Sequence, residues 1–242
     1  SKFESKKIIT RLMYFMCGIA GFTSFSSKTG NQQTLKLMGD AIKHRGPDAS
    51  DTFLNDQIGL CHRRLSIIDL SSAGTQPMHS NCGNYTIVFN GEIYNYVELK
   101  QTLIVDGYEF KSETDTEVLL ALYAIHGANL LDLINGMFAI AIWDNNKNTL
   151  FLARDRIGKK PLYYTLLNDE LVFASELKAL LKIPNIEKEV RADAVYDFFA
   201  YQYIPDPKTI FKNVYKLEPG HSITFDGAKL NKSQYWDLSE SL

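Results

Sequence analysis

The feature that most constrains the fold is a series of apolar, strand-like segments separated by polar turns. They occupy residues 138–143, 150–154, 162–166 and 171–174. Segments joined by such short turns form hairpins, so the sheet that they build should be antiparallel. Many of these segments are apolar at nearly every position, and such strands need cover on both faces.

The first half of the chain alternates strands with helices. Residues 85–89 predict a strand, with Tyr85, Ile87 and Phe89 on one face. Residues 34–43 and 95–106 predict helices, and Thr114 with Glu117 forms the capping-box pattern that opens another. Helices packed against apolar strands favour an α+β layered domain.

Composition excludes several kinds of protein. Of the 242 residues, 45% are hydrophobic and 22% charged, as in ordinary globular domains. The formal net charge is −2, so no strong field favours nucleic acid or an anionic membrane, and we predict neither as a partner. No run approaches the roughly 18 apolar residues that span a bilayer. Small molecules and proteins are the expected partners.

The three cysteines, Cys17, Cys61 and Cys82, include no C-x-x-C pair, and no histidine lies at metal-ligand spacing. This pattern predicts neither a disulfide scaffold nor a metal site, and a reducing cytoplasm fits it best. Cys17 lies in the apolar run 16–22, where a thiol is ordinarily buried and inert.

Residues 1–16 are basic and then briefly apolar, which superficially suggests a signal peptide. The apolar part is too short, and the residues that precede Cys17 are too bulky for a cleavage site. We interpret residues 1–16 as a leader or a mis-assigned start.

Seven motifs downstream change the interpretation of Cys17. In chain order they are His-Arg-Gly-Pro-Asp (44–48), His-Arg-Arg-Leu-Ser-Ile-Ile-Asp (62–69), Asn-Gly-Glu-Ile-Tyr-Asn (90–95), Ser-Glu-Thr-Asp-Thr-Glu (112–117), Gly-Met-Phe-Ala (136–139), Arg-Asp-Arg-Ile-Gly-Lys-Lys-Pro-Leu-Tyr (154–163) and Ala-Ser-Glu-Leu-Lys-Ala-Leu (174–180). In this order they resemble the class II glutamine amidotransferases, most closely the glutaminase domain of glutamine-dependent asparagine synthetases. The resemblance covers about residues 17–181.

The resemblance implies a fold and a division of the chain. The fold is that of the N-terminal nucleophile hydrolases, a four-layer αββα sandwich of two mainly antiparallel sheets. Residues 17–184 would form the glutaminase domain, and residues 185–242 a linker and the start of a truncated synthetase domain. Residues 203–217 resemble the entry segment of that domain, whereas its Ser-Gly-Gly-x-Asp-Ser pyrophosphate loop does not occur in the sequence.

In this family the nucleophile is an N-terminal cysteine whose own α-amino group is the base, and Cys17 matches it. An α-amino group titrates near ~7.7 to 8.0 and a thiol near ~8.5, so the pair suits neutral pH. In the sequence as written Met16 acylates that amino group, and a peptide nitrogen cannot act as a base. Cys17 is therefore competent only in a chain that lacks the Met16–Cys17 bond.

The resemblance also implies the remaining site residues. Asn90 and Gly91 match the oxyanion hole. Arg64 matches the residue that pairs with the α-carboxylate of glutamine, as suits a planar bidentate donor. The ammonium group is assigned to Glu92 and Asp115, the pocket backbone to Leu65, Ser66, Ile67 and Ile68, and the shaping of the pocket to Arg45, Gly46 and Asp48.

Side-chain alternation in a strand separates neighbours within the second motif. Arg63 should face away from Arg64 and be solvated, and Cys61 and His62 should point apart rather than form a dyad. The basic cluster of Arg154, Arg156, Lys159 and Lys160 is predicted to be a solvated rim.

The implied reaction needs no cofactor or metal. ATP and Mg are expected only in the missing synthetase domain, which would receive the ammonia, and the substrate would be L-glutamine. Family members often form dimers, so the resemblance is compatible with a homodimer. Two alternatives also remain open: an amidotransferase for another acceptor, such as a sugar carboxylate, and a non-catalytic domain in which Cys17 stays capped.

Overall fold

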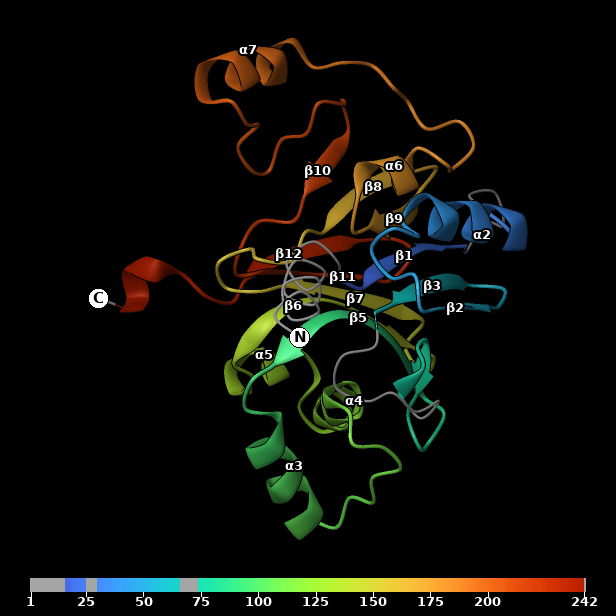
Figure 1. The fold of residues 1–242 in the computed structure, drawn as a ribbon, viewed down its shortest axis with the longest axis vertical. Helices are drawn as coiled ribbons and strands as arrows, with labels where there is room; N and C mark the ends of the chain where they lie inside the picture. The colour runs from blue at the N-terminus through green and yellow to red at the C-terminus, as the bar shows by residue number, and fades with distance from the viewer. Residues whose placement is uncertain (1–15, 25–29, 66–73, 242) are drawn as a thin grey trace, which may run out of the picture.

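Two six-stranded sheets lie face to face in the computed structural model, which describes residues 16–24, 30–65 and 74–241 (Figure 1). The first sheet has the order β10 (Val214–Lys216), β8 (Tyr163–Leu167), β9 (Glu170–Ala174), β1 (Gly18–Thr23), β3 (Ile58–Arg64) and β2 (Ala49–Leu54). The second has the order β12 (Leu230–Gln234), β11 (His221–Phe225), β7 (Thr149–Arg154), β6 (Gly136–Asp144), β5 (Tyr85–Ile93) and β4 (Met78–His79). Neighbouring strands are antiparallel throughout both sheets.

Helices cover the outer face of each sheet. The α-helices are α2 (Gln32–Ala41), α3 (Tyr96–Val105), α4 (Asp115–His126), α5 (Leu130–Leu133), α6 (Leu177–Leu180) and α7 (Ala192–Tyr201), and 3₁₀ turns span Gly127–Asn129 and Leu238–Ser241. One core joins α2 and α6 to the first sheet, and another joins α4 and α5 to the second. The predicted four-layer αββα sandwich is therefore confirmed.

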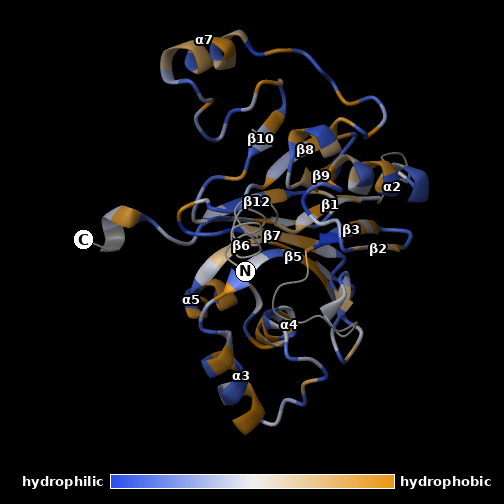
Figure 2. Cartoon of the chain, in the orientation of Figure 1, coloured by the Kyte–Doolittle hydropathy of each residue, from blue (hydrophilic) through white to orange (hydrophobic). Residues whose placement is uncertain are grey.

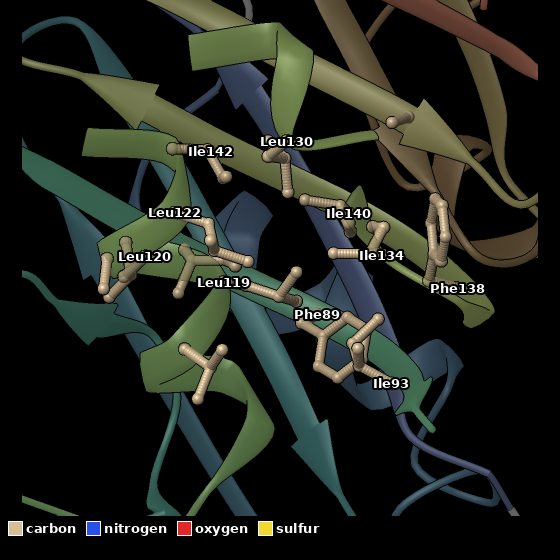
Figure 3. Packing of buried hydrophobic residues seen from close by; sticks show 14 of the residues in the cluster. Phe89, Ile93, Leu119, Leu120, Leu122, Leu130, Ile134, Phe138, Ile140 and Ile142 are labelled. Atoms are coloured by element: carbon tan, nitrogen blue, oxygen red, sulfur yellow. The ribbon is translucent and has the colours of Figure 1, made fainter. Parts of the chain in front are cut away.

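The layer between the sheets is the reason why so many strands are apolar on both faces. Leu60 and Phe173 of the first sheet share a buried cluster with Val88, Ala141 and Leu152 of the second. The opposite face of the second sheet packs on α4 and α5, so its strands meet apolar neighbours on both sides (Figure 3). Strands β6 and β7 are accordingly hydrophobic along most of their length (Figure 2).

The local predictions for these strands are confirmed. The pairs β6–β7 and β8–β9 are antiparallel hairpins. Tyr85, Ile87 and Phe89 face the α4 side of the second sheet, whereas Val88 lies in the core between the sheets. Alternation along β5 thus decides which of its residues face the interior of the sandwich.

Three strands beyond residue 184 belong to the same two sheets. β10 pairs with β8 in the first sheet, and β11 pairs with both β7 and β12 in the second. Helix α7 lies apart from the sandwich, at the top of Figure 1. Within the described residues no helix is long and apolar enough to cross a membrane.

Candidate active site

Cys17 lies directly before β1, the strand whose second residue, Ile19, lies in the core between the two sheets. Its Sγ accepts a hydrogen bond from the backbone N–H of Leu65 at 3.4 Å, and the Cys17 carbonyl accepts one from Arg45 Nε at 3.0 Å. One residue into the strand, the N–H of Ile19 donates to Ser175 Oγ at 3.0 Å and its carbonyl accepts from Ser175 N at 2.8 Å. The backbone from the Cys17 carbonyl into β1 is thereby held in place.

Burial raises the pKa of the Cys17 thiol above its usual range. The hydrogen bond from Leu65 and the positive charges of Lys160 and Arg64 oppose that rise without cancelling it. The thiol is therefore protonated at neutral pH, and it needs a base to become a nucleophile. The peptide nitrogen that joins Cys17 to Met16 cannot be that base.

The open edge of β5 faces the same cleft as Cys17. Backbone N–H groups at alternate residues point to this edge: that of Phe89 donates to Gln76 Oε1 at 2.6 Å, and that of Ile93 donates to Asp115 Oδ2 at 3.1 Å. Gly91 lies between them on the same edge and lines the cleft. A β-carbon at Gly91 would lie 2.1 Å from the carbonyl oxygen of Met137, so no other residue fits this close approach to β6.

Asn90 contributes a side-chain amide whose nitrogen and oxygen are both buried and have no hydrogen-bond partner among the described residues. The residue is 1% exposed and lines the cleft beside Cys17 and Gly91. A buried amide without partners costs about 1 to 3 kcal/mol, so a site that keeps one is suited to pairing it with a ligand. Its nitrogen is a donor on the residue directly before Gly91 in β5.

Charged groups line the rest of the cleft. Arg64, Glu92 and Asp115 all border it, and the guanidinium of Arg64 lies beside Gly74. Burial raises the pKa of Asp115 to about 6, and the negative charge of Glu92 adds to this effect, while the Ile93 N–H opposes it. A cationic ligand at this end of the cleft would relieve the repulsion between the two carboxylates.

The first turn of α4 positions Asp115. Thr114 is the N-cap, and its side chain accepts a hydrogen bond from Glu117 N at 3.3 Å. The reciprocal half of the predicted capping box does not form, because Glu117 accepts instead from the backbone N–H groups of Lys111 and Ser112. Its carboxylate is used to hold the preceding loop.

The His-Arg-Gly-Pro-Asp loop supports the cleft from behind. The Asp48 N–H donates to the carbonyl of Arg64 at 3.1 Å, and a β-carbon at Gly46 would lie 2.3 Å from the Arg63 oxygen. Arg45 connects Cys17 to Glu176, since its Nη1 lies 3.1 Å from Glu176 Oε1. These contacts support the predicted role of the loop in shaping the pocket.

Two predictions about basic residues are wrong. Arg154 and Lys160 are 8% and 4% exposed rather than solvated. Arg154 donates to the carbonyls of Gly158, Lys160 and Leu217, because these loops leave buried oxygens that need a donor. Lys160 borders the cleft, where its Nζ lies 2.7 Å from Met16 Sδ. The burial of these two side chains could not be predicted from the cluster of four charges, because it depends on how the loop packs in the tertiary structure.

Arg63 and His62 show how alternation works in β3. Arg63 faces away from the cleft as predicted, but it is not a free surface charge, since it pairs with Asp40 and donates to the Gly39 carbonyl on α2. Cys61 lies in the core beneath α2, whereas His62 borders the cleft, which confirms that they point apart. Burial lowers the pKa of His62 to about 3, so its ring is neutral.

Most of the predicted residues that the structure describes converge on one cleft. Cys17, Arg64, Leu65, Asn90, Gly91, Glu92 and Asp115 line it together. Ser66, Ile67 and Ile68 lie outside the described residues. The cleft also holds Gln76, Thr116 and Lys160, to which the sequence analysis assigned no role in the site; Thr116 and Lys160 belong to two of the seven motifs. Within the described parts of the chain no three His, Cys, Asp or Glu side chains are grouped to hold a metal ion.

The fold and the cleft together place the chain in the class of two-sheet αββα sandwich proteins that carry a cysteine directly before a central strand. Comparison with known proteins agrees: residues 16–236 match the model of the glutamine amidotransferase domain. The chain belongs to the class II glutamine amidotransferase family.

Relatives and solved structures extend this comparison. The chain is 41% identical over 212 residues to asparagine synthetase [glutamine-hydrolyzing] 1 of Bacillus subtilis, a match that covers 86% of the chain and 33% of that protein. It is also 41% identical to putative asparagine synthetase [glutamine-hydrolyzing] 2 of Methanocaldococcus jannaschii, over 93% of the chain and 47% of that protein. The chain thus spans between a third and a half of these two curated relatives.

The same fold occurs in a glutamine phosphoribosylpyrophosphate amidotransferase from B. subtilis. The TM-score is 0.67 at 19% sequence identity, and the match covers 91% of this chain and 49% of that one. At this identity the likeness supports the two-sheet architecture alone.

Proposed function

We propose that this chain hydrolyses L-glutamine to glutamate and ammonia through a thioester on Cys17, as the ammonia-supplying part of an asparagine synthetase-like enzyme. The observation that carries the proposal is the convergence of the thiol with the unpaired amide of Asn90 and the edge N–H of Gly91. A nucleophile beside two donors is what amide hydrolysis through a tetrahedral intermediate requires.

In the proposed reaction the thiol of Cys17 gives its proton to the free α-amino group of the same residue and attacks the side-chain carbonyl of glutamine. Asn90 Nδ2 and the Gly91 N–H stabilise the oxyanion that forms. The ammonium of Cys17 then protonates the departing nitrogen, which leaves as ammonia. Water, deprotonated by the same amino group, attacks the thioester, releases glutamate and restores the thiol.

Substrate recognition is assigned to the charged ends of the cleft. Arg64 would pair with the α-carboxylate of glutamine, and Glu92 and Asp115 would hold the α-ammonium. The raised pKa of Asp115 supports this role, because a bound cation favours its ionised form. Leu65 contributes pocket backbone, and the same role is proposed for residues 66–68.

The context of the domain is also proposed from its relatives. Ammonia would pass to a C-terminal synthetase domain that uses ATP and Mg. We propose a cytoplasmic location, and a homodimer is compatible with this proposal. The division of the chain near residue 184 stays a prediction, although strands β10–β12 beyond it are paired into both sheets.

One relative carries a name other than asparagine synthetase. The chain is 37% identical, over 92% of its length, to a protein named amidase chry2 from Gibberella zeae. Ammonia release is compatible with either context, because the cleft recognises only the donor of the amide. The acceptor is therefore separate from the glutaminase proposal.

The decisive experiment compares two forms of the protein: one that begins at Cys17, verified by intact mass, and one that retains Met16. Glutamate release from L-glutamine is expected only from the form that begins at Cys17. Equal activity of both forms would contradict the α-amino base, and inactivity of both would support the alternative of a non-catalytic domain.

A further inference from the structure

We propose that Gln76 is a positioning residue that couples the oxyanion donors of β5 to the substrate-ammonium end of the cleft; the inference rests on the proposed glutaminase function. Gln76 is 6% exposed and bridges two elements. Its Oε1 accepts from the Phe89 N–H at 2.6 Å, and its Nε2 donates to Thr116 Oγ1 at 3.1 Å.

The first contact compensates for a missing strand partner. In the described parts of the chain β4 pairs with β5 only through Met78 and His79, and no other described strand lies along this edge of β5 from Phe89 onward. An unpaired N–H there would cost about 1 to 3 kcal/mol. Gln76 supplies the acceptor in place of a strand, at the residue directly before Asn90 and Gly91.

The second contact fixes the first turn of α4. Thr116 is 3% exposed and follows Asp115, whose carboxylate accepts from the Ile93 N–H at 3.1 Å. The contacts therefore close a ring that runs from Gln76 to Phe89, along β5 to Ile93, across to α4 and back through Thr116. Gly91 and Glu92 lie within the strand segment of this ring.

Only an amide side chain of this length meets both demands. The Phe89 N–H requires an acceptor, so Gln76 Oε1 faces Phe89. Gln76 Nε2 then faces Thr116 and donates to its Oγ1, so the two partners set the orientation of the amide. Each polar atom of the Gln76 amide is engaged by one of these two partners, so its effect on the reaction is assigned to the positions of Phe89 and Thr116.

The two arms of the bridge can be separated by mutation. Gln76→Met keeps the length of the side chain but removes both hydrogen bonds. We expect it to lower kcat about 10-fold, less than the ~100-fold or more lost when an oxyanion donor itself is removed, and to raise KM for glutamine. Thr116→Val removes only the α4 arm and should raise KM with kcat within about twofold of the parent.

A matched control is Thr86→Val, which removes a buried hydroxyl from the same strand, where Thr86 Oγ1 lies 2.9 Å from His79 Nδ1. Its kcat and KM should equal those of the parent. All variants are assayed with the Cys17-initiated protein below their unfolding temperatures. If Gln76→Met does not fold, the KM of Thr116→Val tests the proposal by itself: a raised KM supports it and an unchanged KM overturns it.

The proposal requires a KM effect from Thr116→Val and a combined kcat and KM effect from Gln76→Met. A Gln76→Met protein that unfolds at a lower temperature but keeps both constants, or two variants that change kcat equally, would overturn it. An inactive parent enzyme would instead refute the proposed function.

Discussion

Asp115 accepts a hydrogen bond from the backbone N–H of Ile93 at 3.1 Å, which ties the first turn of α4 to the open edge of β5. The contact holds a carboxylate in a buried position beside Glu92, and its pKa is raised to about 6. In the proposed site, substrate binding would therefore be coupled to pH at this residue.

Glutamine binding should weaken as the pH falls through about 6. Asp115 is then protonated and no longer attracts the substrate ammonium, so KM should rise toward pH 5. Asp115→Asn should show a high KM at every pH in this range. Steady-state kinetics between pH 5 and 8 measure both, and an unchanged pH dependence in Asp115→Asn would contradict the assignment.

The stability of the same variant has a defined sign. Since the folded-state pKa of Asp115 lies above its unfolded value of 3.8, the free energy of unfolding falls as the pH rises from about 4 to 6. Asp115→Asn should lose this destabilisation. The unfolding temperature of the variant minus that of the parent should therefore increase from pH 4 to pH 7.

Asn90→Ala should separate catalysis from stability. Loss of an oxyanion donor is expected to lower kcat by about 10² to 10³. The unfolding temperature should be close to that of the parent, because the amide that is removed has no partner. A variant with near-parent kcat would show that Asn90 does not contact the oxyanion.

Cys17→Ala should abolish glutamate release and leave folding intact. Among the described residues the sulfur hydrogen-bonds only with Leu65, at 3.4 and 3.7 Å, so the substitution breaks no strong hydrogen bond. Circular dichroism checks the fold, and residual activity near that of the parent would refute the nucleophile.

Lys160→Met tests the electrostatics around the nucleophile. The buried ammonium of Lys160 interacts with Cys17, and a neighbouring positive charge disfavours protonation of an amino base. Removing it should shift the acidic limb of the kcat profile to higher pH. Lys159→Met, which changes the adjacent residue, is the control and should leave the limb in place.

A chain that ends after Ile183 should lose stability. It lacks β10, β11 and β12, and with them Val214, Ile223 and Phe225, which are at most 2% exposed. Each such side chain contributes about 1.5 to 3 kcal/mol on burial. Thermal unfolding at the temperature of the longer chain would instead support an autonomous domain that ends near residue 184.

The sequence was sufficient for elements that depend on local pattern. Hairpin turns and strand alternation predicted β6–β9 and the faces of β5, because side-chain direction in a strand repeats every two residues. The motif order predicted which residues gather around Cys17, and most of those that the structure describes line one cleft.

The structure alone showed how these residues are held. Gln76 and Lys160 carry no local signal of their roles, since their partners lie 13 and 144 residues away in the chain. The burial of Arg154 and the hydrogen bond that Glu117 accepts from the Ser112 N–H could likewise not be predicted from the sequence. Each depends on which backbone groups a loop leaves unpaired.

The sequence by itself thus determined the αββα class and the family, since these follow from periodicity and from residue types in a fixed order, and it predicts Cys17 as the nucleophile. Tertiary structure decided that the β5 edge, left open by a two-residue β4, is completed by side chains. The physical reason is that buried N–H groups must find acceptors, and only the assembled fold determines which ones are near.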